Sequence, residues 1–187
     1  MPWPSERSRD GGVDEVPLPP TTRGRVFMCG KHAIAPDPNG LLDRIGATTA
    51  VCLTEADEMR GRYPEYVSWL AANAPNRAVH HPIPDMHAPD LDELATLIED
   101  LAGRVERGDV LVVHCGAGIG RAGTVVAALL MKLGAERDEA LATVRAHRPM
   151  AGPEVGLQAD ALVEYGRRLS LEHGRATQSP HPPRPKD

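Results

Sequence analysis

The segment Val110–Thr124 constrains the fold of this chain more than any other stretch. It reads VLVVHCGAGIGRAGT, so an apolar run of strand length leads into a glycine-rich turn and then into a helical pattern. A short continuous apolar run of this kind is typical of a central strand that is covered on both faces. The segment therefore predicts a strand, a tight loop and a helix in direct succession.

The rest of the chain alternates between strand and helix patterns, which predicts an α/β fold with a central, mostly parallel sheet flanked by helices. Asp90 and Glu93 have the spacing of a capping box for one of these helices, and Gly108 is suited to end it. We expect strands at Arg25–Cys29, Thr48–Leu53, Ala78–Ile83 and Val110–His114, and helices at Leu41–Ile45, Pro64–Ala72, Asp90–Arg107, Arg121–Leu133, Glu136–His147 and Glu154–Glu172.

A length of 187 residues fits one domain with modest tails. Residues 1–22 are rich in Pro, Gly, Ser and charge, which predicts a flexible arm. Residues 174–187 have the same character and predict a disordered Pro-rich tail, with a docking ligand in polyproline conformation as the minor alternative. The sequence therefore predicts one folded domain of residues 23–173.

Charge and composition exclude several classes of function. The net charge of −5 provides no strong basic field for nucleic acid. No apolar run approaches the roughly 20 residues of a membrane helix, and the N-terminus lacks a secretory signal. The three cysteines form no CxxC pair, which argues against a zinc site and fits a reducing, cytoplasmic location. We expect no metal and no cofactor, and the sequence leaves the oligomeric state open.

The loop between Cys115 and Arg121 is suited to bind an oxyanion. Its backbone N–H groups can point inward as an anion nest, and its glycines permit positive φ and close approach of the ligand. The helix that begins near Arg121 adds its positive end, and the guanidinium can bind two phosphate oxygens. The expected phosphate-binding residues are Gly116, Ala117, Gly118, Ile119, Gly120 and Arg121.

The same field acts on Cys115. A thiol has a pKa of about 8.5 when unperturbed, and positive surroundings at a helix N-terminus lower it to roughly 3.5–7.5. The sequence therefore predicts a thiolate at neutral pH, next to a bound phosphate and ready to attack it. A dinucleotide loop or a Walker loop is excluded because the glycine spacing and the Lys-Ser/Thr pair are missing.

The motif His114-Cys115-x-x-Gly118-x-x-Arg121 resembles the signature of the protein tyrosine and dual-specificity phosphatases. The similarity extends loosely over residues 23–172, and it is greatest to the small group that includes the cyclin-dependent-kinase-associated phosphatases. It implies hydrolysis of phosphate monoesters through a phosphocysteine intermediate. His114 would then support the loop rather than act as a base.

Asp85 is the expected general acid. It lies in the segment PIPDMHAP after a predicted strand, and this segment resembles the acid loop of the family. Protonation of the leaving oxygen by such an acid contributes about 10²–10⁴-fold in rate. Asp90 is the competing carboxyl group, but it is better explained as a helix N-cap.

One position departs from the family pattern. The family usually has Ser or Thr directly after the arginine, and its hydroxyl helps the sulfur to leave in the second step, whereas this chain has Ala122. Thr124 lies two residues further on as a supporting candidate. The resemblance suggests that Gln158 places the hydrolytic water or packs on the loop, although a surface glutamine is an equal alternative.

Several other side chains carry weaker signals. Glu55 and Glu58 are interpreted as solvated acids at the start of a helix, although they could border the cleft around the phosphate-binding loop. Lys31-His32 is interpreted as a turn, with a position at the entrance of that cleft as the alternative. The histidines His80, His81 and His87 are not interpreted as metal ligands, because adjacent strand residues point to opposite faces. Cys29 and Cys52 lie in apolar strand contexts and are expected to be packed core thiols.

Phosphoinositide phosphatases of the superfamily that this chain resembles use lysines in the loop to bind extra phosphates. The loop interior here contains no Lys or His, so the resemblance argues against a highly charged inositol lipid as substrate. A phosphoprotein or phosphopeptide is therefore the expected substrate, through phosphotyrosine and also phosphoserine or phosphothreonine. Two alternatives stay open. One is a pseudophosphatase that binds phosphoprotein without hydrolysing it, and the other is a sulfur or arsenate transferase.

Overall fold

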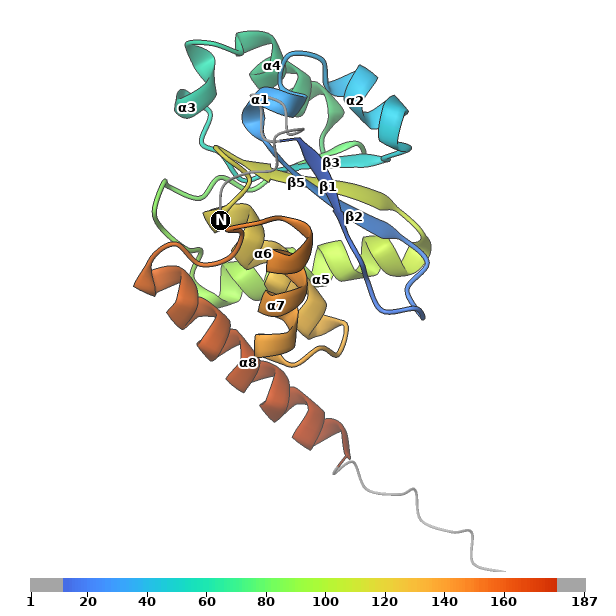
Figure 1. The fold of residues 1–187 in the computed structure, drawn as a ribbon, viewed down its shortest axis with the longest axis vertical. Coiled ribbons are helices and arrows are strands. Elements are labelled where there is room, and N and C mark those ends of the chain that lie inside the picture. The colour runs from blue at the N-terminus through green and yellow to red at the C-terminus, as the bar shows by residue number, and fades with distance from the viewer. Residues whose placement is uncertain (1–11, 178–187) are drawn as a thin grey trace, which may run out of the picture.

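A computed structural model describes residues 12–177, which form a five-stranded sheet between two layers of helices (Figure 1). The strands are β1 (Val13–Val16), β2 (Arg25–Gly30), β3 (Thr49–Cys52), β4 (Ala78–His80) and β5 (Val110–Cys115). Their order in the sheet is β1-β2-β5-β3-β4, with β2, β5, β3 and β4 parallel and β1 antiparallel to β2. The predicted α/β fold with a mostly parallel sheet is thereby confirmed.

The helices divide by sequence between the two faces of the sheet (Figure 1). One face carries α1 (Lys31–Ile34), α2 (Pro38–Ile45), α3 (Asp57–Arg60) and α4 (Pro64–Asn73), and the other carries α5 (Leu91–Arg107), α6 (Gly120–Lys132), α7 (Arg137–His147) and α8 (Gly156–Thr177). Two apolar clusters form accordingly, one on each side of the sheet. Helix α6 is buried from Gly120 to Met131, which explains its nearly continuous apolar sequence.

Local sequence signals explain where α5 begins and ends. The Asp90 carboxylate accepts a hydrogen bond from the Glu93 amide, and the Glu93 side chain accepts one from the Asp90 amide, as the predicted capping box requires. Gly108 ends the helix in the left-handed region at φ 103°. Because β5 follows at once, this stop fixes where the central strand begins.

The prediction of a flexible arm over residues 1–22 is wrong for β1. Four residues, Val13–Val16, pair with β2, and Val16 is 1% exposed in the core. A short edge strand with two carboxylates gives only a weak apolar signal, and pairing with β2 supplies what the local sequence lacks. At the other end, α8 continues to Thr177, four residues into the predicted tail. The remaining parts of the predicted arm and tail, 1–11 and 178–187, lie outside the described residues.

The predicted strand Ala78–Ile83 is classified only as far as His80. Its backbone nevertheless continues to pair with the end of β3, because the His81 and Ile83 amides donate to the carbonyls of Cys52 and Leu53. Pro82 has no N–H to contribute between them. This extension carries the chain along the sheet edge toward Asp85.

Candidate active site

The loop from Cys115 to Arg121 follows the central strand of the sheet. In the register of the parallel strands, Cys115 lies opposite Gly30 at the end of β2, and His114 lies opposite Cys52 at the end of β3. The Lys31 amide, at the start of α1, donates to the Gly116 carbonyl at 3.1 Å. The strand ends therefore gather the loop, α1 and the segment after β3 at one edge of the sheet.

Tight packing explains why the loop needs glycine at position 118. Gly118 has φ +72°, and a Cβ atom there would overlap the carbonyl of Cys29. The loop then enters α6, whose N-cap residue, Ile119, has no side-chain oxygen for the amides of the first turn. Uncapped amides at a helix N-terminus form a favourable site for an oxyanion. Cys115 is 3% exposed at the start of this loop.

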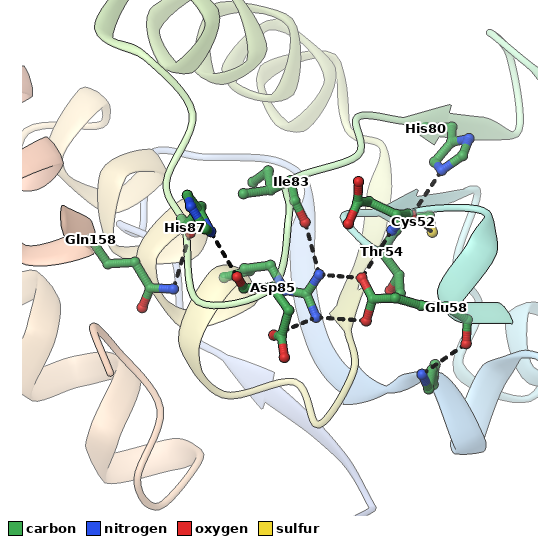
Figure 2. Close-up of polar contacts among 11 residues, drawn as sticks. Cys52, Thr54, Glu58, His80, Ile83, Asp85, His87 and Gln158 are labelled. Carbon is green, nitrogen blue, oxygen red and sulfur yellow. Dashed lines mark hydrogen bonds and ion pairs between the residues drawn. The ribbon is translucent and has the colours of Figure 1, made fainter. Parts of the chain in front are cut away.

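Arg121 is almost fully buried and is held by contacts on two sides. Its two terminal nitrogens donate to the Glu58 carboxylate at 2.6 and 3.1 Å, and Nη1 also donates to the Ile83 carbonyl at 2.8 Å. Figure 2 shows Glu58, Ile83 and Asp85 directed toward one place between them. Burial lowers the pKa of Arg121, but the hydrogen bonds with Glu58 and the nearby negative charges outweigh burial, so its pKa is raised.

Glu58 is therefore not a solvated acid, and that interpretation is wrong. Burial raises the pKa of this carboxyl group, but the hydrogen bonds and charge of Arg121 prevail, so the net shift is downward. The Lys31 ammonium adds a hydrogen bond to the Glu58 carbonyl at 3.1 Å, and Lys31 begins helix α1 rather than forming a turn. No local signal in the sequence links Glu58 to Arg121, because α3 reaches the loop only through the tertiary fold.

Asp85 lies at the same place, as Figure 2 shows. Its Oδ1 is 3.0 Å from Nη2 of Arg121, and its side chain is 70% exposed. The carboxylate is thus positioned by the arginine of the loop while it stays open to solvent. The chain turns back directly after Asp85. The His87 amide donates to the Pro84 carbonyl, and Nδ1 of the His87 ring contacts the Asp85 carbonyl at 2.8 Å.

Gln158 is 1% exposed, so the alternative of a surface glutamine is wrong. Its Nε2 donates to the His87 carbonyl at 3.1 Å, and its Oε1 accepts from the Glu154 amide at 2.8 Å. The side chain thereby ties the segment that carries Asp85 to the start of α8. Glu154, which the sequence analysis did not single out, has its carboxylate against Gly120, where an added Cβ atom would overlap it.

His114 is fully buried, and its Nε2 forms a 2.6 Å hydrogen bond with the Tyr66 hydroxyl of α4. Burial lowers the pKa of this imidazole to about 3, so the ring is neutral at pH 7. The hydrogen bond connects the end of β5 to the helical layer on that face. The structure thus places His114 beneath the loop, with α4 as its anchor.

Ala122 and Thr124 occupy the first turn of α6. Ala122 is fully buried, and the Thr124 hydroxyl donates to the Gly120 carbonyl at 2.8 Å within the helix. The hydroxyl of Thr124 is therefore engaged by the backbone of its own helix. No hydroxyl stands at position 122, where the family pattern has one.

Cys29 and Cys52 are fully buried, which confirms them as packed core thiols. Burial raises the pKa of each to about 12, so both stay protonated at neutral pH.

His80 contacts the Thr54 carbonyl at 2.9 Å through Nε2. Among residues 12–177 no group of three or more His, Cys, Asp or Glu side chains is arranged to hold a metal ion. None of the helices in this range is long and apolar enough to cross a bilayer.

Arg148 is a further residue that the sequence did not indicate. It follows α7 directly, and although it is an arginine it is fully buried. Its Nε donates to the Gly118 carbonyl at 2.5 Å and its Nη2 to the Ala117 carbonyl at 2.8 Å. A residue before a proline at a helix end signals only the stop of the helix, and its contact with the loop arises from the fold.

This chain is similar to known phosphatase domains. A family model described as the Swiss Army Knife protein DSP-PTPase phosphatase domain, PTP-SAK, matches residues 25–175. Mouse dual specificity protein phosphatase 8 is 38% identical over 72 residues, which is 38% of this chain and 11% of that protein. Pig cyclin-dependent kinase inhibitor 3 is 30% identical over 93 residues, 49% of this chain and 44% of that protein. The chain thus spans less than half the length of these relatives.

Solved structures show the same fold. The active form of Tk-PTP aligns with a TM-score of 0.62 at 29% identity, covering 80% of this chain and 98% of that one. Kinase associated phosphatase aligns with a TM-score of 0.71 at 20% identity, covering 88% of this chain and 98% of that one.

Proposed function

This chain belongs to the dual-specificity phosphatase domain family, and we propose that it hydrolyses phosphate monoesters on phosphoproteins or phosphopeptides. The observation that carries the proposal is the 3.0 Å contact between Asp85 and Arg121 beside the loop that begins at Cys115. This contact puts the carboxylate of Asp85 beside Arg121, at the opposite end of the loop from Cys115, which supports a shared role for the three residues. We assign the activity to residues 23–173, together with strand β1.

In the first step, the loop amides and Arg121 hold the phosphate while the Cys115 thiolate attacks phosphorus. The S–P bond forms, the P–O bond of the ester breaks, and the leaving oxygen takes a proton from Asp85. In the second step, water attacks phosphorus and gives its proton to the Asp85 carboxylate. The S–P bond then breaks, which releases inorganic phosphate and restores the thiolate.

The contacts of Arg121 support this order of events. Glu58 holds both terminal nitrogens and so fixes the plane of the guanidinium. Asp85 contacts only Nη2 and is exposed to solvent. A bound phosphate would therefore displace Asp85 from Arg121 and leave it beside the leaving oxygen, where its proton is needed.

The charge around the loop supports phosphoprotein rather than a polyphosphorylated ligand. Three carboxylates, those of Glu58, Asp85 and Glu154, lie at or against the loop, and its interior has no Lys or His. Like charges disfavour a second phosphate near the first. The match to a protein named a dual specificity protein phosphatase supports phosphorylated protein substrates, both phosphotyrosine and phosphoserine or phosphothreonine. A reducing, cytoplasmic location fits a mechanism that needs a reduced Cys115.

A phosphoprotein-binding module without turnover is the second candidate, and Ala122 is the observation that favours it. Without a hydroxyl at this position, release of the sulfur in the second step loses a donor. The presence of Cys115, Arg121 and Asp85 together makes hydrolysis the first choice.

Hydrolysis of p-nitrophenyl phosphate and phenyl phosphate tests the proposal. We expect vanadate-sensitive release of phosphate that Cys115→Ser abolishes. Asp85→Asn should lower kcat on phenyl phosphate by about 10²–10⁴-fold while KM is retained. The fall in kcat should be smaller on p-nitrophenyl phosphate, because p-nitrophenolate is the better leaving group. Asp57→Asn, an exposed carboxylate paired with Arg60 on α3, is the matched control and should behave as wild type. Full activity of Cys115→Ser would refute the mechanism, and binding of phosphopeptide without hydrolysis would favour the binding module.

A further inference from the structure

The buried guanidinium of Arg148 connects the phosphate loop to strand β1. On one side it donates to the carbonyls of Ala117 and Gly118. On the other, its Nη1 donates to the Asp14 carboxylate at 2.5 Å and reaches the Gly12 carbonyl at 3.4 Å. Asp14 lies in β1, opposite Met28 of β2, and its side chain is 16% exposed.

These contacts have a direct consequence for the orientation of the loop. Amides can point inward toward an oxyanion only if the neighbouring carbonyls point outward, and outward carbonyls need donors. Arg148 supplies two N–H donors to two successive carbonyls of the loop. The planar fork of a guanidinium suits this geometry, whereas an ammonium has no such fork.

The arginine in turn requires a counter-charge. Arg148 is fully buried, and a buried cation without a partner is strongly unfavourable. Within the part of the chain that the structure describes, Asp14 provides a carboxylate that contacts it, at 2.5 Å. Loss of that charge would draw the guanidinium toward water and away from the loop carbonyls.

We propose that Asp14 is a positioning residue for the phosphate loop, acting through Arg148. The assignment rests on the proposed phosphate-binding function and extends it to a strand outside residues 25–175, the part that matches the family model. It also gives β1 a role in the site beyond its place at the edge of the sheet.

The neighbouring residue Glu15 provides a matched control. Glu15 lies on the same strand and forms an exposed ion pair with Arg25 at 2.7 Å. Successive strand residues point to opposite faces, so Glu15→Gln removes the same charge on the side away from Arg148. An exposed pair of this kind contributes little to stability.

The experiment compares phosphate binding and turnover in the full chain carrying Asp14→Asn or Glu15→Gln. Affinity for inorganic phosphate is measured from the rise in Tm with phosphate concentration, which reports binding independently of activity. We expect Asp14→Asn to bind phosphate about tenfold more weakly and to lose about 10- to 100-fold in kcat/KM on p-nitrophenyl phosphate. Glu15→Gln should match wild type in both.

The inference would be overturned if the phosphate affinity and the kcat/KM of Asp14→Asn were both within twofold of the values for Glu15→Gln. The inference would also be overturned if the loss of phosphate affinity and kcat/KM disappeared when each variant was assayed at the same interval below its own Tm. The loss would then come from general destabilisation of the fold. Arg148→Lys serves if Asp14→Asn does not fold, because it keeps the charge beside Asp14 but loses the fork. Wild-type phosphate binding by Arg148→Lys would also overturn the inference.

The outcomes separate this inference from the proposed function. A wild-type chain that binds phosphate but hydrolyses no ester refutes the function, and weaker binding by Asp14→Asn would still support the inference. A wild-type chain that hydrolyses esters, with Asp14→Asn equally active, refutes the inference alone. Absence of phosphate binding in the wild-type chain refutes both.

Discussion

Ion pairs with Arg121 bring two carboxylates, those of Glu58 and Asp85, to the candidate active site. Arg121 is buried between the Glu58 carboxylate and the Ile83 carbonyl, and it also contacts the exposed Asp85. Glu58 therefore orients the arginine, while Asp85 is able to exchange partners when an oxyanion arrives. In this way two carboxylates on one guanidinium receive different roles from their different exposure.

Ala122 is the residue whose replacement tests the second step. We expect Ala122→Ser to speed breakdown of the phosphocysteine intermediate, because its hydroxyl can donate to the leaving sulfur. The wild-type chain should show a burst of p-nitrophenol followed by a slower steady rate, and the variant should show a smaller burst and a faster steady rate. Rapid-mixing kinetics measure both phases.

Val125→Thr is a suitable control for Ala122→Ser, since it also introduces a hydroxyl at a fully buried position of α6. An unpaired buried hydroxyl costs about 1–3 kcal/mol, so the unfolding free energies of both variants need to be compared. An unchanged ratio of burst to steady rate in Ala122→Ser would contradict the prediction.

At the scale of elements, the site is a junction between strand ends and helix starts. The loop leaves β5, packs against the last residues of β2 and enters α6, so its shape depends on how closely these elements approach. Gly118 is a point of close approach, because an added Cβ atom there would overlap the Cys29 carbonyl. Rigid elements of this kind hold a loop in one conformation better than the loop sequence could alone.

We expect Gly118→Ala to lower kcat/KM by at least about 100-fold, because a Cβ atom at φ +72° would strain the backbone and overlap the Cys29 carbonyl. Steady-state hydrolysis of p-nitrophenyl phosphate and a thermal melt measure the effects on activity and folding. Gly61→Ala is the matched control, since Gly61 has φ −70° and open space around its Cα. It should keep full activity and be neutral or about 0.4–1 kcal/mol more stable. Full activity of Gly118→Ala would contradict the close packing described for the loop.

At the scale of the whole molecule, the sheet buries a titratable ring between two layers of helices. Burial lowers the pKa of His114 to about 3, whereas an imidazole in the unfolded chain has its ordinary pKa of 6.5. Between these values the unfolded state binds a proton that the folded state does not, so stability rises with pH. The contribution is fully present above pH 6.5 and is lost as the pH falls toward 3.

This linkage predicts that the free energy of unfolding falls by about 2 kcal/mol between pH 7 and pH 5 on account of His114. Urea unfolding at the two pH values measures it. His114→Gln should remove most of the difference, whereas His147→Gln, at an exposed position of α7, should retain it. A wild-type chain equally stable at both pH values would contradict the burial of a neutral imidazole. The Glu58 pKa, which is lowered, adds a further loss only below about pH 4.5.

Local patterns predicted most of the elements because the signals were strong. The apolar run Val110–His114, the capping box at Asp90 and the glycine stop at Gly108 each depend on neighbouring residues alone. Strand β1 and the short helices α1 and α3 were missed, since they contain four residues each and owe their order to neighbours elsewhere in the chain. The roles of Cys115 and Arg121 were predicted from the motif, and that of Asp85 from the resemblance of the segment PIPDMHAP to the acid loop of the family.

Most of the strands and helices, and the loop with its cysteine and arginine, can be predicted from local patterns, because these features are encoded by residues within one helical turn or one strand of each other. The pairing of Glu58 with Arg121, the contact of Gln158 with the segment of Asp85, and the link from Asp14 through Arg148 to the loop depend on the tertiary fold. Each of these contacts links residues that are far apart in the chain, and the local sequence around a polar side chain does not indicate which distant residue it will contact. Burial selects the partner, because a charge or amide removed from water has to find one wherever the packing of the sheet and helices places it.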